Sequence, residues 1–257
     1  MIFKEIISHT SLLSALVERQ LAARYRGSIL GFVWSFLNPL VLMIVYTIVF
    51  QHFTRVGSME FYSLYLFSGL LPWMWTTSAL SEGTSSITSS GHLVTKSLFP
   101  AHILVLASVI TSGIHFILTL PLFILFSFFS GKSLPIAILY FPILILFHGI
   151  FLFGLTLGLS SLNVRFRDVQ HLVGSVITIL FFLSPILYPL SMVPDKYLDL
   201  FILNPFSALT ILYHAVLFGE YSYVESAMYS VSFWSLLAVC FGLTLFGRGR
   251  ERFAEYL

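Results

Sequence analysis

The chain has 257 residues, and only 13 of them are Lys or Arg and 11 are Asp or Glu. Charged residues therefore make up 9% of the chain, while 58% is hydrophobic and the mean hydropathy is +0.95. These values exclude a soluble domain, which would need a charged surface at this length. The net charge of +2 says little by itself, and we expect no nucleic-acid partner.

Charged residues avoid six long stretches of the chain. The charge-free runs are residues 27–54, 61–81, 97–131, 133–164, 169–194 and 226–247. Each is long enough to cross a hydrocarbon layer of ~30 Å at ~1.5 Å per helical residue. Helices satisfy their own backbone hydrogen bonds in lipid, so we expect an all-α polytopic membrane protein with six transmembrane helices.

The distribution of Lys and Arg predicts the orientation. With six spans and a cytoplasmic N-terminus, ten of these residues lie inside and three outside. The ten are Lys4, Arg19, Arg24, Arg26, Lys96, Arg165, Arg167, Arg248, Arg250 and Arg252, and the three are Arg55, Lys132 and Lys196. This positive-inside bias predicts that both termini are cytoplasmic.

Residues 1–26 precede the first span and read as a helix lying along the membrane surface. Apolar residues recur there at helical spacing, with charged residues between them. They are Ile2, Phe3, Ile6, Ile7, Leu13, Leu16 and Val17. The segment is either a plain anchor or a platform between the membrane and a cytoplasmic partner. The six-span domain then covers residues 27–257, and Pro39 should kink its first span because proline lacks a backbone donor.

An ordered aromatic stripe runs along one face of span one. Its members are Phe32, Phe36, Met43, Tyr46 and Phe50, and Phe181 and Phe182 of span five could join them. One interpretation is ordinary helix packing. The other is a channel lining on which sugar rings stack and slide without fixed hydrogen bonds, and this second interpretation is our prediction for these seven residues.

Spans three and four carry a histidine each. His115 and His148 lie 17 and 16 residues from Lys132 in the outer turn, so an antiparallel hairpin puts them at one depth. Ionisable residues inside a membrane are functional candidates, here for proton coupling. The alternative is a neutral histidine bonded to a hydroxyl such as that of Thr111 or Ser112.

Two further patterns concern packing and the outer side. Gly154 and Gly158 are four residues apart in span four, which is a weak signal for close helix packing. Residues 190–218 are apolar but too broken to span, and Asn204-Pro205 resembles a helix start with Asn as the cap. We expect a re-entrant pair of short helices in the outer leaflet, which makes this segment a gate candidate.

The sequence contains no nucleotide-binding motif. Gly131-Lys132-Ser133 would need a glycine at position 126 to form a phosphate loop, and Phe126 stands there. The single cysteine, Cys240, can form no intrachain disulfide, and no cluster typical of a metal site occurs. We therefore expect a transporter subunit with no catalytic residue, bound cofactor or metal of its own.

Four stretches carry a resemblance to a known family. They are Arg24-Tyr-Arg-Gly-Ser-Ile-Leu-Gly-Phe-Val-Trp-Ser-Phe-Leu-Asn-Pro39, Asn163-Val-Arg-Phe-Arg-Asp168, Pro185-Ile-Leu-Tyr-Pro189 and Leu203-Asn-Pro205. In order and spacing, the chain resembles the permease subunits of polysaccharide-exporting ABC transporters, the Wzm/TagG-like class. The likeness runs from the N-terminal helix to span six and so covers nearly the whole chain.

The resemblance implies partners and a place in the cell. The permease would be a homodimer in the bacterial cytoplasmic membrane, assembled with two copies of a separate ATP-binding subunit that holds ATP and Mg. The substrate would be a lipid-linked polysaccharide, such as O-antigen or teichoic acid on a polyprenyl pyrophosphate carrier. The channel would form between the two permeases, within membrane lipid.

The resemblance also implies roles for particular segments. The cytoplasmic connection 83–100, which could form a short helix, would couple to the ATPase through His92, Thr95 and Lys96. The outer gate would be residues 190–218, with Tyr188, Pro189, Asn204 and Pro205. A cluster of arginines at the cytoplasmic edge would meet the pyrophosphate head group, since arginine binds phosphate in a two-pronged fork. These are Arg24, Arg26, Arg165 and Arg167, and the alternative is that they only set the topology.

Two other functions remain open. An ABC exporter of a lipid or a drug would share the architecture. A proton-coupled secondary transporter would use His115 and His148, would need no ATPase, and would favour repeated halves, which we do not see. Co-purification of an ATPase subunit in stoichiometric amounts separates these readings.

Overall fold

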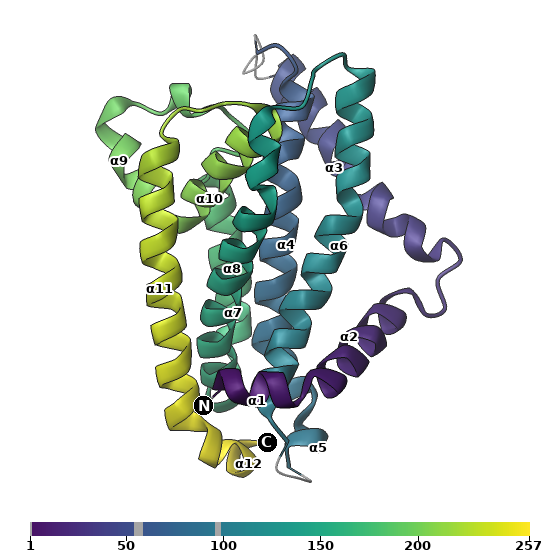
Figure 1. The fold of residues 1–257 in the computed structure, drawn as a ribbon, viewed down its shortest axis with the longest axis vertical. Coiled ribbons are helices and arrows are strands. Elements are labelled where there is room, and N and C mark those ends of the chain that lie inside the picture. Colours follow the sequence, from purple (N-terminus) through teal and green to yellow (C-terminus); the bar gives the residue numbers. More distant parts are fainter. Residues whose placement is uncertain (1, 54–58, 96–98) are drawn as a thin grey trace.

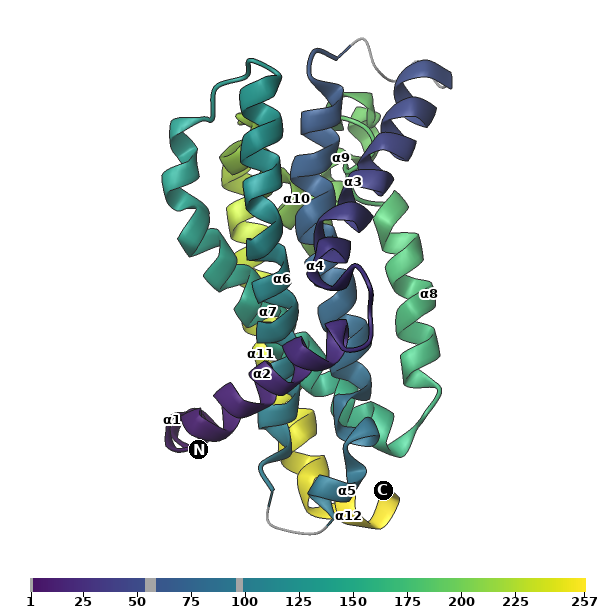
Figure 2. The same cartoon turned by 90° about the vertical axis from the view of Figure 1, so that its right-hand side faces the viewer.

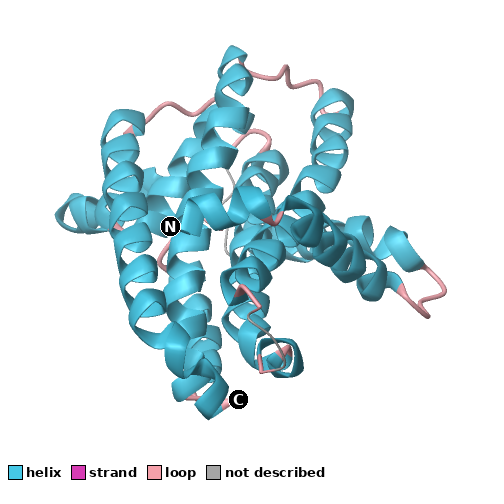
Figure 3. Cartoon of the chain, turned by 60° about the horizontal axis from the view of Figure 1, so that its bottom comes forward, coloured by secondary structure: helices cyan, strands magenta, loops and turns pink. Residues whose placement is uncertain are grey.

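The computed structural model describes residues 2–53, 59–95 and 99–257, and this part of the chain is built of helices without any strand (Figures 1 and 3). In chain order the first elements are α1 (Ile2–Ser8), α2 (Thr10–Tyr25), η1 (Gly31–Val33), α3 (Trp34–Thr47), η2 (Ile48–Phe53), α4 (Tyr62–Ser89), α5 (Gly91–Val94) and α6 (Ala101–Phe129). It continues with η3 (Ile136–Tyr140), α7 (Phe141–Arg165), α8 (Val169–Phe182), η4 (Leu190–Met192), α9 (Asp195–Leu203), α10 (Pro205–Tyr213), η5 (His214–Phe218), α11 (Val224–Gly249), η6 (Arg250–Arg252) and α12 (Phe253–Tyr256).

Four stretches of helix are long and apolar enough to cross a membrane, so the chain is a multi-pass membrane protein. They are Gly31–Gln51, Ala101–Phe129, Ile136–Arg165 and Val224–Arg252. A fifth results if α9 and the helix from Pro205 to Phe218, which meet at an angle of 93°, count as one span. By length and composition the described residues thus give four or five spans, where the charge-free runs predict six.

The difference from six concerns α4 and α8. Helix α4 has 28 residues, yet Ser, Thr, Tyr and Trp lower its apolarity. It lies at the centre of the bundle against α3, α6, α7 and α8, so protein rather than lipid surrounds most of it. Helix α8 has 14 residues and ends at Phe182, because the chain leaves the helix before Pro185. A criterion that requires long apolar helices therefore detects neither α4, which is too polar, nor α8, which is too short.

Helices α7 and α11 form a close pair, and glycines allow it. Gly154 lies directly against the backbone of Ala238 and Val239, where an added Cβ would stand 2.6 Å from the nearest atoms. Gly242 approaches the backbone of Gly154 in turn, and Gly158 faces the ring of Phe241. The small-residue packing that Gly154 and Gly158 predict is confirmed.

The N-terminal segment crosses one end of the bundle (Figure 2). It is two helices, α1 and α2, because the helix breaks at His9. Leu16 and Val17 on α2 are buried against the start of α6, while the opposite face of α2 is exposed, as expected for a helix with one apolar face. Both termini lie at this same end of the molecule (Figure 1), which we call the inner end.

The polar connection after span two is shorter than the predicted range 83–100. Helix α4 continues to Ser89, and only the four-residue α5 follows it. His92 lies on α5 and Thr95 caps it, with the Thr95 hydroxyl donating to the Gly91 carbonyl. Lys96, which we grouped with them, lies outside the described residues.

The opposite end, the outer end, carries the short helices of residues 190–218. Helix α9 and helix α10 meet at Asn204, whose side chain accepts a hydrogen bond from the Phe206 amide at 3.1 Å, and Pro205 is the first residue of α10. The predicted cap is therefore confirmed, and two short helices meet at it.

Candidate functional site

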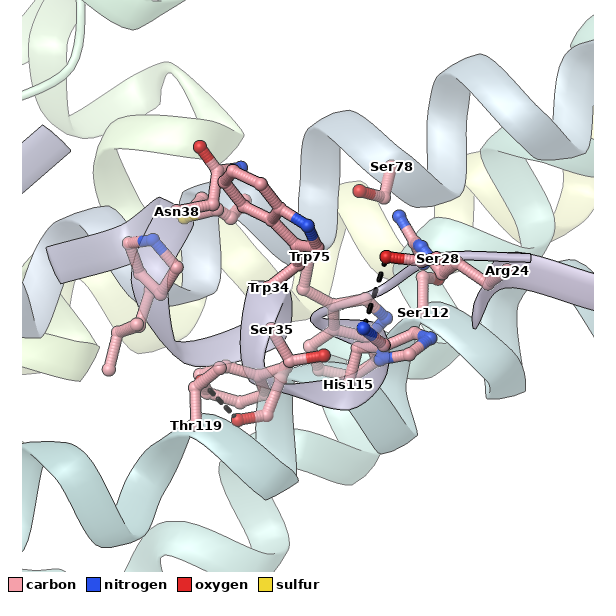
Figure 4. A pocket seen from close by; sticks show the side chains of 15 residues that line it. Arg24, Ser28, Trp34, Ser35, Asn38, Trp75, Ser78, Ser112, His115 and Thr119 are labelled. Atoms are coloured by element: carbon pink, nitrogen blue, oxygen red, sulfur yellow. Dashed lines mark hydrogen bonds between the residues drawn. The ribbon is translucent and has the colours of Figure 1, made fainter. Parts of the chain in front are cut away.

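A polar hollow of about 310 Å³, which we call the inner polar hollow, lies between α3, α4 and α6, midway along α4 and α6 (Figure 4). Figure 4 shows side chains from three elements around it, among them Trp34 of α3, Ser78 of α4 and His115 of α6. The link between α2 and α3 closes one side, where Gly31 takes the left-handed φ of 45° and its amide donates to the Ser28 hydroxyl at 3.0 Å. A non-glycine residue would be strained in that turn.

A second hollow of about 440 Å³ lies closer to the inner end than the first, and Arg24 lines both. The Arg24 guanidinium at the end of α2 pairs with the Glu82 carboxylate of α4 at 3.1 Å. This ion pair ties the N-terminal segment to the central helix. Both side chains are more than a third exposed, so the pair contributes at most ~1 kcal/mol to stability.

The four predicted head-group arginines do not share one environment. Arg24 is bound to Glu82, and Arg26 caps α2 in an exposed position. Arg165 ends α7 and lies over the ring of Phe166 at 5.0 Å, while Arg167 is exposed in the link to α8. The sequence grouped them by their place at the membrane edge, and it could not reveal that Glu82 already engages one of them.

An aromatic hollow of about 450 Å³ lies between α3, α4 and α8. Three of the seven predicted channel residues line it: Tyr46, Phe181 and Phe182. The Tyr46 and Phe181 rings lie 5.8 Å apart and the Phe181 and Phe182 rings 5.4 Å apart. Trp73 of α4, which the stripe did not include, joins them at 5.6 Å from Phe181.

The remaining residues of the stripe are placed differently. Met43 is buried in the core of the bundle, and Phe50 packs against that core and against Tyr46 at 6.4 Å. Phe32 and Phe36 pair with one another at 5.1 Å near the start of α3. One face of α3 therefore serves packing at Met43 and lines the aromatic hollow at Tyr46.

His148 is buried and engaged on both nitrogens. Thr76 Oγ1 lies 3.0 Å from Nε2 and the Tyr213 hydroxyl lies 3.1 Å from Nδ1. Thr76 donates its own proton to the Pro72 carbonyl, so the ring donates to Thr76 and accepts from Tyr213. This is a neutral histidine among hydroxyls, as the second interpretation expects, although the partners are not Thr111 or Ser112. His115 lies apart from it and lines the inner polar hollow.

Residues 183–189, which we call the outer turn, are held by side chains of α4 and η5. The Tyr62 hydroxyl donates to the Leu187 carbonyl at 2.6 Å, and the Tyr65 hydroxyl donates to the carbonyls of Pro185 and Tyr188 at 2.9 and 3.1 Å. The His214 ring stacks on Tyr65 at 3.9 Å and donates through Nε2 to the Pro185 carbonyl at 3.0 Å.

The sequence analysis missed this anchoring of the outer turn. The four predicted gate residues all belong to it or adjoin it: Tyr188 bonds the Phe182 carbonyl, Pro189 is buried, and Asn204 donates to the Leu183 carbonyl before Pro205. Two tyrosines three residues apart at the start of an apolar helix were the available signal. Among the described residues, no group of three or more His, Cys, Asp or Glu could hold a metal ion.

The sequence is similar to a known protein family and to individual relatives within it. Residues 11–220 match the family described as ABC-2 type transporter. The chain belongs to this family. It is 35% identical over 98% of its length, and over 97% of the relative, to the O-antigen export system permease protein RfbA of Myxococcus xanthus. It is also 31% and 30% identical to two permeases of the same description from Klebsiella pneumoniae, over 96% of this chain and 95% of each relative.

Proposed function

We propose that this chain is the transmembrane subunit of an ABC exporter that moves a lipid-linked polysaccharide, such as O-antigen, across the bacterial cytoplasmic membrane. The observation that carries the proposal is the similarity to the Myxococcus xanthus O-antigen export permease, which extends over nearly the whole of both chains. A match of this extent includes the N-terminal segment, the outer helices and every long span, so it supports a shared task rather than a shared element alone.

The proposed topology has six spans and cytoplasmic termini. Helices α4 and α8 complete the four long apolar spans, and α9 with α10 forms a re-entrant pair at the outer end. Ten of the 13 Lys and Arg residues then face the cytoplasm. The bend of 93° at Asn204 supports the re-entrant arrangement, because it turns the chain back instead of continuing across the membrane.

The energy would come from a separate ATP-binding subunit, since the sequence has no phosphate loop. ATP and Mg would bind to that subunit. We assign its docking site to the inner end, at the residues around α5 that include His92 and Thr95. Two copies of the chain would assemble with two copies of the ATPase.

The export path would run between the two copies, along the aromatic hollow of α3, α4 and α8. The exposed apolar residues on α3 and α8 support this placement, because they need either lipid or a second copy beside them. Tyr46, Phe181 and Phe182 would offer ring faces to the apolar faces of passing sugars. Such contacts depend on area rather than on a fixed pattern of donors, so a long polymer can slide over them.

A host strain that lacks this chain tests the proposal. The polymer should still be made, and it should accumulate on the cytoplasmic side, where an antibody or lectin reaches it only after the cells are permeabilised. Returning the intact chain should restore surface polymer. Unchanged surface polymer in the deletion strain refutes polysaccharide export, whereas a loss of surface lipid or drug efflux alone would favour the other ABC exporter functions.

A further inference from the structure

Two polar stripes face one another across the boundary between α4 and α6. On α4 the stripe is Ser78, Glu82, Ser85 and Ser89, and on α6 it is Ser108, Ser112, His115 and Thr119. Each repeats at intervals of three or four residues, which places its members on one side of a helix. The two inner hollows lie along these stripes, with Arg24 at the boundary between them. We call these two adjoining hollows together the inner crevice.

Seven of the hydroxyl groups that line the inner crevice donate their protons to other groups of the chain. Ser85, Ser86 and Ser89 donate to backbone carbonyls of α4, and Ser108, Ser112 and Thr119 donate to carbonyls of α6. Thr111 donates to the Gln20 side chain of α2 at 2.9 Å. A hydroxyl that donates to a carbonyl still has oxygen lone pairs that accept. The crevice therefore offers mostly acceptors.

This polarity decides which ligands suit the crevice. A phosphate is an acceptor only, so it needs donors, and the strongest donor there is Arg24. The guanidinium of Arg24 is engaged by Glu82 at 3.1 Å, and the two formal charges cancel. A sugar hydroxyl, in contrast, has a proton to donate to each serine or threonine oxygen. Uncharged saccharides therefore match this lining better than phosphate does.

Two tryptophans add the second property of a saccharide site. Trp34 is 53% exposed and Trp75 lies deeper, and both line the inner polar hollow (Figure 4). Trp75 is fixed, because its indole N–H donates to the Val109 carbonyl at 3.2 Å and its ring stacks on Phe116 at 5.4 Å. Trp34 therefore offers the exposed indole face that can cover the apolar C–H face of a sugar ring, and Trp75, which is 4% exposed, forms a fixed wall behind it. A volume of about 310 Å³ is at the low end for small-molecule sites, which suits one or two sugar rings.

We propose that the inner crevice between α4 and α6, roofed by α2, binds an uncharged saccharide unit of the polymer before it enters the export path. This inference rests on the proposed function and adds a site within each single chain, beside the path between two copies, with which it shares Asn38, Met74 and Ser78. The Arg24–Glu82 ion pair lies between the two hollows of the crevice. Breaking this ion pair would let the sugar pass from the larger hollow, which Glu82 lines, to the one that Trp34 lines.

Photo-cross-linking in cells tests the site with the native polymer as the probe. The amino acid p-benzoylphenylalanine replaces Trp34 in the full chain, expressed with its natural partners. The same replacement at Phe182 probes the export path, and at Phe233, an exposed ring on α11, it serves as the lipid-facing control. After irradiation, mild acid cleaves the pyrophosphate link, and the part of the substrate that stays on the chain is identified by periodate oxidation of its sugars.

We expect the chain labelled at Trp34 to keep periodate-sensitive sugar after acid treatment, and the chain labelled at Phe233 to keep none. Adding Ser112→Ala with Thr119→Ala, which both line the inner polar hollow and not the aromatic one, should lower the yield at Trp34 by roughly tenfold, since two acceptors are lost. Ser81→Ala, an exposed serine of α4 that lines neither hollow, should leave the yield unchanged.

Four outcomes overturn the inference. Lipid alone on the Trp34 probe after acid treatment means that the crevice takes the carrier and not the sugar. Sugar on the Phe182 probe but none on the Trp34 probe leaves the proposed function standing and removes the crevice site. Equal labelling of the Trp34 and Phe233 probes shows contact without a site. Sugar on none of the three probes contradicts the proposed function as well.

Discussion

Replacing Gly154 by alanine tests the packing of α7 on α11, on which the whole bundle depends. The new Cβ would stand 2.6 Å from the Ala238 carbonyl carbon and the Val239 nitrogen and 2.8 Å from the Ala238 oxygen. Real Cβ atoms almost never come so close to other atoms. Because all three neighbours belong to the backbone of α11, no side chain can rotate aside, and the two helices must separate.

Two opposing effects determine the size of the loss. Alanine favours a helix over glycine by ~1 kcal/mol, and overpacking costs ~1–3 kcal/mol, with backbone contacts at the upper end. We expect a net loss of about 2 kcal/mol, which corresponds to a fall in Tm of roughly 4–8 °C for a chain of this size.

Thermal unfolding of the purified full chain in mild detergent, followed by size-exclusion chromatography, measures this effect. Gly247→Ala is the matched control, because Gly247 lies on α11, the helix against which Gly154 of α7 packs, and an added Cβ there meets nothing within 4 Å. That variant should keep or raise the Tm. If Gly154→Ala is as stable as Gly247→Ala, the close backbone contact between α7 and α11 is wrong.

Three further predictions concern charges and the outer turn. Either Arg24→Glu or Glu82→Arg alone should weaken assembly, and the double variant, which exchanges the two charges, should restore it. If the double variant also restores export in full, Arg24 has no separate role in binding a phosphate head group. Tyr65→Phe removes the donor to two carbonyls of the outer turn and should lower the free energy of unfolding by ~1–3 kcal/mol in the melting assay. Tyr197 is an exposed tyrosine of α9, so Tyr197→Phe should leave stability unchanged. Equal losses of stability in the two variants would contradict the anchoring of the outer turn. Burial raises the pKa of Glu220 above its ordinary 4.5, against the opposing charge of Lys132. The folded chain therefore holds this proton more tightly than the unfolded one, and stability should fall as the pH rises from about 4.5; a Glu220→Gln variant that melts with the same pH profile would refute this.

The sequence predicted the parts of the fold that depend on local pattern. Long apolar runs mark the spans, Asn204-Pro205 marks a helix start, and Gly154 marks close packing, since each of these signals is read from a few neighbouring residues. The number of spans is harder to read. A central helix such as α4 can be polar because protein surrounds it, and a short helix such as α8 looks longer in a charge-free run that also contains a turn.

The candidate site was predicted only in part, because its contacts join residues distant in sequence. Glu82 lies 58 positions after Arg24, and nothing in the local sequence pairs them. The aromatic stripe on span one included Tyr46, which lines the aromatic hollow, yet periodicity alone could not separate it from Met43, which faces the core. The inner crevice offers acceptors because hydroxyl groups that line it donate to backbone carbonyls of their own helices. These hydrogen bonds become visible only with the structure.

Reconstituted transport tests the central claim most directly. Proteoliposomes would contain this chain with its ATP-binding partner and the lipid-linked polymer, and a glycan-modifying enzyme enclosed in the vesicles would report polymer that reaches the interior. We predict modification only when this chain, the partner and ATP are all present, and none with a partner unable to hydrolyse ATP. Polymer entry that needs neither the partner nor ATP would contradict export by an ABC transporter, and ATP-dependent activity without entry of any polymer would contradict polysaccharide as the substrate.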